Sequence, residues 1–538
     1  MSGLNLLSFI GIFALCGIAW LTSENRRVIP WRTIAWGIGL QLILGLFIFL
    51  VPLTRSLLEV ISNAVNSVLD AAQEGARFIF GSQLVPDSSS VPGPVLAGRW
   101  IARAITPPYV PVAGDRLSTN LLDLGYIFAF RALPAVIFFS ALMALLYALG
   151  LIQPIVNLFA RIFRRSMNLS GAEALSGAAN IFVGVEATLV VRPYLERMTR
   201  SELCAILTSC FGSIASTVLA LYVGFLRPVF PNITGHLISA SIMAIPACFV
   251  ISKILVPETE IPETMGRAVE ESRVVAAESG LRDKAPERSP TTYPPDAPSE
   301  QETAIASSET VQQPTDDVPK ATAPFTAIPE PVVESREPII NQLPLSPMEA
   351  IVVGALDGVK LAAAIAALLI AVLGLVALVK LFFGNLASLS ASSQPFIQSI
   401  GNVFKIVTLE NILGALFLPL TFLTGVSLKW QELWQSSVLI GQRLLLTEVY
   451  SYEQLAVLAS QGVLSQRALL VVSYALCGFA HLSSVGIFVG GLVSLAPSRR
   501  KDITELSWKA LWAATLATLM IGCVAGLYDT GNPGIIGR

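Results

Sequence analysis

The sequence predicts an all-α polytopic membrane protein with eight transmembrane helices. Of its 538 residues, 54% are hydrophobic and 13% are charged, whereas soluble domains carry about 25% charged residues. The apolar residues form runs close to the roughly 20 residues that a helix needs to cross the hydrocarbon core. These runs lie at 5–21, 33–51, 128–151, 203–226, 236–255, 350–383, 471–496 and 508–528. The composition excludes a soluble enzyme, a nucleic-acid binder and a disulfide scaffold.

Two further regions, 171–196 and 411–463, are apolar but interrupted by Gly, Asn, Glu, Thr and Ser. Irregular backbone at membrane depth is tolerated only where protein buries it or a watery cavity hydrates it. Broken helices in two corresponding halves of a chain are typical of a transporter's central site. The pattern therefore favours two re-entrant segments, related as an inverted repeat, around a polar site.

Residues 257–347 carry 17 acidic and 7 basic residues, and 15 of the 33 prolines. A segment of this composition has too little apolar surface to offset the entropy lost on ordering the chain. We expect a disordered acidic linker between two membrane halves.

Basic residues predict the topology because they collect in cytoplasmic loops. They cluster between the first two spans, after the third span and between the last two, at Arg26, Arg27, Arg32, Arg161, Arg164, Arg165, Arg499, Arg500 and Lys501. With these clusters in the cytoplasm, both termini lie outside and the linker lies inside. Residues 52–127 are then an external segment with interfacial character.

Two carboxylates, Glu186 and Glu448, lie inside apolar sequence. A charged side chain at the bilayer centre costs about 2.5–3.5 kcal/mol on insertion scales and usually faces a cavity or a partner. Either residue could instead be an interfacial carboxylate at a helix end, or could pair with Arg192 or Arg443. If neither alternative holds, both are candidate site residues.

Other polar residues at depth have a simpler alternative. Asn180, Ser213 and Thr217 could line a site or only hydrogen-bond neighbouring helices. His481 would by default be a satisfied core histidine, and His236, at the mouth of a span, an interfacial one. The six cysteines lie in apolar stretches without C-x-x-C spacing, so we expect buried free thiols and no zinc site. With two isolated histidines and no nucleophile–base pair, the sequence does not predict an enzyme.

The chain resembles the concentrative nucleoside transporter family over almost all of its length outside the linker. The resemblance rests on ordered motifs that include Ser170-Gly171-Ala172-Glu173, Met198-Thr199-Arg200-Ser201-Glu202, Ala475-Leu476-Cys477-Gly478-Phe479-Ala480 and Ser483-Ser484-Val485-Gly486-Ile487. It implies a homotrimer in the inner membrane, whose transport domain contains two opposed re-entrant hairpins and two broken helices. It also implies sodium-coupled nucleoside import by an elevator-type movement, with some bacterial relatives using protons.

The resemblance suggests five parts of the chain. These are N-terminal scaffold helices (1–151), the first half of the transport domain (152–256), the linker (257–347), a long scaffold helix with an external interfacial segment (348–408) and the second half of the transport domain (409–538).

The family's sodium site uses an Asn, a hydroxyl and two backbone carbonyls. Position by position these match Asn180, Ser213, Val183 and Ile214. Oxygen ligands suit a hard cation, and all four positions are kept. The resemblance therefore favours sodium as the coupling ion.

The family's substrate site is kept unevenly. Its first hairpin reads Gly-Gln-Thr-Glu, whereas this chain reads Gly184-Val185-Glu186, one residue shorter and without the base-binding Gln. Because one residue rotates a helix by about 100°, Glu186 need not reach the same point. Val218 matches the family's apolar contact with the nucleobase.

The ribose half of the site is closer to the family pattern. Glu448 matches the hydroxyl-binding Glu, and Phe479 and Ser484 also match. His481 replaces an Asn, and its charge could change between pH 5 and 8. Three interpretations follow: a sodium-coupled importer of nucleosides or a related riboside, a proton-coupled one, or a non-transporting sensor descended from a transporter.

Overall fold

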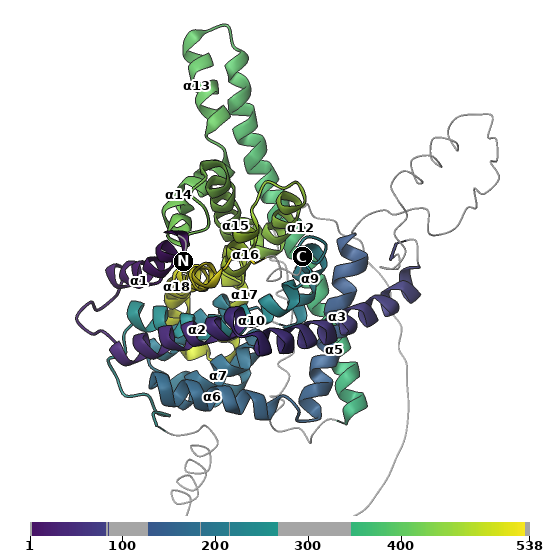
Figure 1. Ribbon diagram of the computed structural model, residues 1–538, viewed down its shortest axis with the longest axis vertical. Coiled ribbons are helices and arrows are strands. Elements are labelled where there is room, and N and C mark those ends of the chain that lie inside the picture. Colours follow the sequence, from purple (N-terminus) through teal and green to yellow (C-terminus); the bar gives the residue numbers. More distant parts are fainter. Residues whose placement is uncertain are drawn as a thin grey trace, which may run out of the picture. The chain divides into compact units, whose positions relative to one another are not determined.

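A computed structural model describes residues 3–81, 84–85, 127–182, 184–214, 216–266 and 346–532. All regular structure within these ranges is helical (Figure 1). Before the linker lie α1 (Gly3–Leu21), α2 (Trp31–Leu50), α3 (Pro52–Phe80), α5 (Phe128–Ala148), α6 (Gln153–Met167), α7 (Gly171–Asn180), the 3₁₀ helix η2 (Val185–Arg197), α8 (Arg200–Gly212), α9 (Ser216–Leu226) and α10 (Ile233–Leu255). After it lie α12 (Pro347–Ser388), η4 (Leu389–Ala391), α13 (Pro395–Ile406), α14 (Leu409–Leu423), α15 (Trp430–Ser460), α16 (Gln466–Ala475), α17 (Leu482–Leu495), η5 (Pro497–Arg499) and α18 (Arg500–Tyr528).

The described residues contain six helices long and apolar enough to span a membrane, or seven if the bent pair α13 and α14 counts as one span. These six candidate spans correspond to α1, α2, α5, α10, α12 and α18. The other two expected spans, 203–226 and 471–496, are each broken, the first between α8 and α9 and the second between α16 and α17. The all-helical membrane fold is thus confirmed, and the two breaks account for the difference from eight continuous spans.

Each broken helix has a local cause in the backbone. Ser213 ends α8 in an extended conformation, with φ −112° and ψ 164°. Between α16 and α17 the chain passes through Gly478, which has φ +157°. Within α15 the helix is interrupted at Thr447, whose φ of +75° is rare for a residue with a branched side chain. Three polar breaks therefore interrupt otherwise apolar helices.

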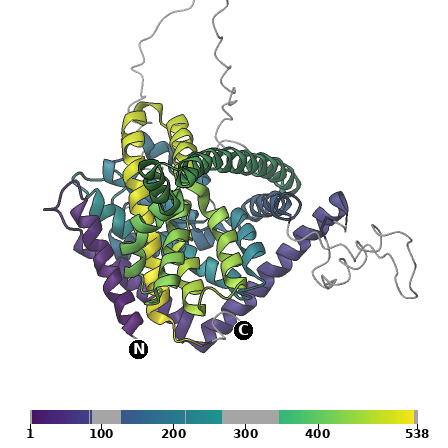
Figure 2. The same cartoon turned by 90° about the horizontal axis from the view of Figure 1, so that it is seen from above.

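The last helix forms the centre of the packing. α18 contacts α1, α8, α10 and α16, and its residues from Ala513 to Leu527 are all buried. α5 and α12, by contrast, pack mainly on each other and expose most of their remaining surface (Figures 1 and 2). At 42 residues, α12 is about 63 Å long and exceeds the roughly 30 Å hydrocarbon core.

Two neighbouring helices begin with reciprocal caps. Ser170 and Glu173 form a capping box on α7, and Thr199 and Glu202 form one on α8. Each box satisfies two backbone N–H groups that a helix start leaves without partners. The motifs that carried the family resemblance therefore fix where these helices start.

The linker expected over 257–347 differs at its start, because residues up to Gly266 pack onto the helices. Gly171 N donates to Thr264 O at 3.0 Å, and Ala172 N donates to Thr264 Oγ1 at 3.1 Å. Lys253 Nζ lies 2.5 Å from Glu173 Oε1 and 3.1 Å from Glu258 Oε2. These contacts hold the segment at the start of α7. The rest of the expected linker, 267–345, lies outside the described residues.

A second charged group joins the α1–α2 loop to α8 and α18. Glu24 pairs with Arg200 at 3.1 Å and also with Lys509. Burial opposes ionisation of Glu24, but these two cations hold the pKa of its carboxyl below the ordinary value. The pairs are partly exposed, and such pairs contribute about 0–1 kcal/mol each.

The segment expected outside the membrane, 52–127, begins with α3, a 29-residue helix with polar and apolar faces. This amphipathic pattern is the one expected of a helix at an interface. Apart from 84–85, residues 82–126 lie outside the described ranges.

The buried ion pair between Lys253 and Glu173 yields a stability prediction. Their side chains are only 7% and 1% exposed, and removing one partner of a buried pair costs about 3–5 kcal/mol. Lys253→Met should therefore lower the thermal unfolding midpoint in detergent markedly. Arg197→Met breaks the exposed pair with Glu263 and should cost less than about 1 kcal/mol. Equal midpoint shifts for the two variants would contradict this account.

Candidate functional site

The break between α8 and α9 (the first break) and the break between α16 and α17 (the second break) lie against each other. A Cβ atom added to Gly478 would lie 3.0 Å from the carbonyl carbon and oxygen of Gly212, and 2.9 Å from Thr518 Cγ2. The chain between α16 and α17 thus crosses directly over the end of α8. Such close approach of two backbones is possible because residue 478 has no side chain.

Glu448 lies one residue after the break in α15 and is 2% exposed. Tyr222 of α9 donates its hydroxyl to Glu448 Oε1 at 2.9 Å. The other carboxylate oxygen, Oε2, lies 2.9 Å from His481 Nε2. Tyr222 therefore compensates part of the cost of burying this carboxylate, whereas His481 lies at ion-pair distance from Oε2, which has no hydrogen-bond partner among the described residues.

His481 is fixed by its place at the start of α17. Its Nδ1 accepts the backbone N–H of Ser484 at 3.2 Å, as an N-cap does. Because Nδ1 is the acceptor, the hydrogen of the neutral ring lies on Nε2, the nitrogen that faces Glu448. His481 is therefore more than a satisfied core histidine, since it orients the carboxylate.

Arg443 does not pair with Glu448, although a pairing was one alternative from the sequence. Its Nη1 donates to Ala475 O at 2.6 Å and to Thr518 Oγ1 at 3.0 Å. Ala475 is the last residue of α16, where carbonyl groups lack helical partners and carry partial negative charge. The buried guanidinium thus supports the second helix break and leaves Glu448 to Tyr222 and His481.

Residues of the expected sodium site are brought together in part. Asn180, at the end of α7, is fully buried, and its Nδ2 donates to Ser209 Oγ at 3.0 Å. Ser213 Oγ donates to Ser209 O at 2.8 Å, and Ile214 is 1% exposed. A hydroxyl that donates in this way keeps its lone pairs for a cation. Val183 lies outside the described residues.

The base-binding half is described less fully. Gly184 is buried and precedes η2, which begins at Val185. The side chains of Val185, Glu186 and Thr217 lie outside what the structure describes. Val218 is 5% exposed and lies on α9, one helical turn before Tyr222.

Phe479 and Ser484 lie beside the second break. Phe479 is partly buried, and its ring centroid lies 6.4 Å from that of His481. Ser484 Oγ donates to the carbonyl oxygen of His481 at 2.6 Å. The expected ribose-side residues Glu448, Phe479, His481 and Ser484 therefore gather around this break.

The expectation of an interfacial His236 is wrong. The residue is 4% exposed, and its Nδ1 lies 2.9 Å from the hydroxyl of Tyr474. Its ring also packs near Phe49 and Phe230. The cause is that α10 is buried along almost its whole length, including its first turn.

Sequence reasoning missed Tyr222 and Tyr452. Their rings stack with centroids 4.4 Å apart and planes at 25°. One signal was available, because a tyrosine buried in an apolar span needs a partner for its hydroxyl. The spacing of four residues between Val218 and Tyr222 also places both on one helix face.

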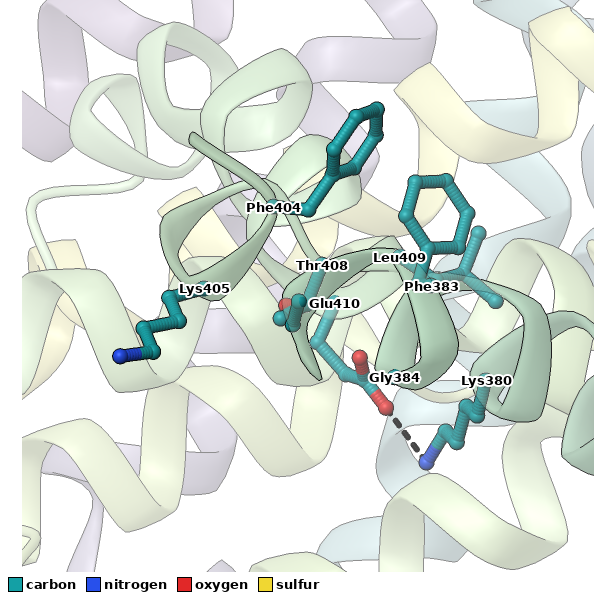
Figure 3. A pocket seen from close by; sticks show the side chains of 9 residues that line it. Lys380, Phe383, Gly384, Phe404, Lys405, Thr408, Leu409 and Glu410 are labelled. Atoms are coloured by element: carbon teal, nitrogen blue, oxygen red, sulfur yellow. Dashed lines mark ion pairs between the residues drawn. The ribbon is translucent and has the colours of Figure 1, made fainter. Parts of the chain in front are cut away.

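A cavity of about 370 Å³ lies away from these residues in the fold, between the end of α12, α13 and the start of α14 (Figure 3). Lys380 pairs with Glu410 at its wall, and Phe383 and Phe404 also line it. None of the residues expected to bind a solute or an ion lines this cavity.

Three family models match the chain. They describe the Na⁺ dependent nucleoside transporter N-terminus (residues 10–83), nucleoside recognition (129–229) and the Na⁺ dependent nucleoside transporter C-terminus (318–526). The matches span both sides of the expected linker.

Curated relatives agree with these matches. An uncharacterized transporter of Haemophilus influenzae is 31% identical over 97% of both chains. The nucleoside permease NupC of Helicobacter pylori is 28% identical over 97% of this chain and 98% of its own. Human solute carrier family 28 member 3 is 29% identical over 98% of this chain, which spans 60% of that longer protein.

Solved structures share the fold. CNTnw in an inward-facing substrate-bound state is 30% identical, with a TM-score of 0.70 and 99% of both chains covered. A variant of CNTnw in an outward-facing state gives a TM-score of 0.71 at 30% identity, again over 99% of both chains.

The crossing of the two breaks yields a prediction for Gly478. A methyl group there would press on the Gly212 backbone, so Gly478→Ala should displace α17 from α8 and lower the unfolding midpoint by several degrees. Gly486, on exposed α17, has no atom within 4 Å of an added Cβ. Gly486→Ala is therefore the control and should leave the midpoint unchanged or higher, because Ala favours helix. A tolerated Gly478→Ala would contradict the close crossing.

Proposed function

This chain belongs to the Na⁺ dependent nucleoside transporter family, and we propose that it imports nucleosides, or a related ribosylated solute, by coupling their entry to sodium. It is a multi-pass membrane transporter, and its relatives are transporters rather than enzymes. The substrate, the coupling ion and the movement are the proposed elements.

The observation that carries the proposal is the buried carboxylate of Glu448. Its two oxygens are oriented by Tyr222 and His481 at 2.9 Å each, yet a carboxylate has about four acceptor positions. The remaining positions suit the hydroxyl groups of a ribose. We assign Phe479, His481 and Ser484 to the ribose side, and Gly184, Val185, Glu186 and Val218 to the base side.

Sodium coupling is supported by the oxygen donors at the first break. Asn180 and Ser213 are buried, and both hydrogen-bond to Ser209, Asn180 to its hydroxyl oxygen and Ser213 to its backbone carbonyl. With the carbonyls of Val183 and Ile214 they would supply only oxygen ligands, as a hard cation prefers.

Proton coupling is the second candidate, and the contact between His481 and Glu448 favours it. The pair is 4% and 3% exposed, and an intramembrane histidine–carboxylate pair is a common element of proton relays.

The movement and the assembly are also proposals. We propose an elevator-type movement of the two broken-helix halves within a homotrimer in the inner membrane, with both termini outside the cytoplasm. The trimer is supported by the apolar surface of α12, where Leu375, Leu378 and Phe382 are each more than 60% exposed. The long α12 would contact lipid and neighbouring subunits.

The transport proposal is tested by uptake of labelled uridine into proteoliposomes. With an inward sodium gradient we expect accumulation that ceases when choline replaces sodium. Collapsing the pH gradient at constant sodium should leave uptake unchanged. Sodium-independent uptake that ceases with the pH gradient would instead support proton coupling. Absence of uptake of uridine, adenosine and inosine by folded protein would contradict both.

The sodium ligands are tested by two matched serine variants. Ser213 and Ser507 are both buried, and each donates its hydroxyl to the carbonyl four residues earlier. Ser213→Ala should raise the sodium concentration for half-maximal uptake about tenfold, because it removes a ligand. Ser507→Ala should leave that concentration unchanged. Equal sodium dependence in the two variants would remove Ser213 from the site.

A further inference from the structure

Among the described residues of the first half of the chain, Tyr222 is the one that hydrogen-bonds to the Glu448 carboxylate. Its ring and hydroxyl are completely buried in α9, and the hydroxyl donates to Glu448 Oε1 at 2.9 Å. A hydrogen bond to a charged group contributes about 1.5–3 kcal/mol, more than a neutral one. The direction of the carboxylate therefore depends on where Tyr222 is held.

The position of Tyr222 is held by a second tyrosine. Its ring stacks on Tyr452, with centroids 4.4 Å apart, and Tyr452 lies one helical turn after Glu448 on α15. Tyr452 donates its own hydroxyl to Ser473 O of α16 at 2.7 Å. The Tyr452 ring therefore holds the Tyr222 ring in place from α15, the helix that carries Glu448. The Tyr452 hydroxyl does not take part in this, because it is bonded to α16.

We propose that Tyr222 is a positioning residue that sets the preference for a ribose with its full diol. With Tyr222 on Oε1 and His481 facing Oε2, the carboxylate cannot rotate freely. Its unused lone pairs then point to one place, where two adjacent hydroxyl groups can donate to it together. This inference rests on the proposed function, because it assumes that Glu448 binds the sugar.

Helix α9 carries both Tyr222 and the expected nucleobase contact, Val218. Val218, the expected nucleobase contact, lies four residues earlier on α9, on the same face. A shift of α9 would therefore move the base contact and the carboxylate's donor as one unit. Removing only the hydroxyl should alter recognition of the sugar and leave recognition of the base intact.

The test measures binding of uridine, 3′-deoxyuridine and cytidine to purified full-length protein, with sodium present, as ligand-dependent thermal stabilisation. Tyr222→Phe keeps the ring and its stack but loses the donor. Tyr452→Phe is the matched control, since it loses the other hydroxyl of the same pair. Glu448→Gln is the reference for loss of the carboxylate, and the combined variant Glu448→Gln with Tyr222→Phe completes a double-mutant cycle.

We expect Tyr222→Phe to weaken uridine binding about tenfold and to reduce the preference for uridine over 3′-deoxyuridine. The ratio of uridine to cytidine should not change, and Tyr452→Phe should keep both ratios. In the Glu448→Gln background, Tyr222→Phe should have no further effect on the sugar preference, which would show that it acts through the carboxylate.

Three contradicting results can be distinguished. If the unaltered protein binds nucleosides and Tyr222→Phe keeps the same preference for uridine over 3′-deoxyuridine, the role of Tyr222 is wrong and the proposed function stands. A full effect of Tyr222→Phe in the Glu448→Gln background would overturn its action through Glu448. If the unaltered protein binds neither these three nucleosides nor adenosine and inosine, both the proposed function and this inference are overturned.

Discussion

The structure around the site depends on one buried charge, the carboxylate of Glu448. A carboxylate at this depth is stable only if donors surround it. Tyr222, from the first half of the chain, donates a hydrogen bond to Oε1, and His481, from the second half, lies 2.9 Å from Oε2. The backbone serves the same end, since Thr447 takes a rare positive φ directly before Glu448 and His481 caps α17 while it faces the carboxylate. The broken helices and the polar site are therefore one feature.

The contact between the breaks places the expected ion ligands next to the expected sugar-binding residues. The end of α8, with the expected sodium ligands at Ser213 and Ile214, lies against Gly478 at the second break. Arg443 caps α16 on the same side. An ion bound at the first break and a sugar bound at the second break would both stabilise the place where the chain at Gly478 crosses the end of α8. Coupling through shared contacts of this kind requires no distant relay.

The sequence allowed the membrane class, six of the eight expected spans and most residues near the second break to be predicted, because hydropathy and intramembrane charge act locally. The hydrogen-bonding and ion-pair partners of the buried residues were harder to predict. Arg443 was a reasonable candidate for Glu448, five residues away, but an α-helical spacing no longer holds across the break at Thr447. Tyr222 is 226 residues from Glu448, and no local pattern reports such a contact. The packed start of the linker at Thr264 escaped prediction for the same reason, since composition cannot reveal a cap on a distant helix.

A structure of the protein with bound uridine and sodium, determined by cryo-electron microscopy, tests the central claim most directly. The account predicts ribose hydroxyl groups within hydrogen-bond distance of Glu448, with Tyr222 still donating to Oε1 and His481 still beside Oε2. A ribose bound away from Glu448, or a carboxylate turned from Tyr222 toward Arg443, would contradict it.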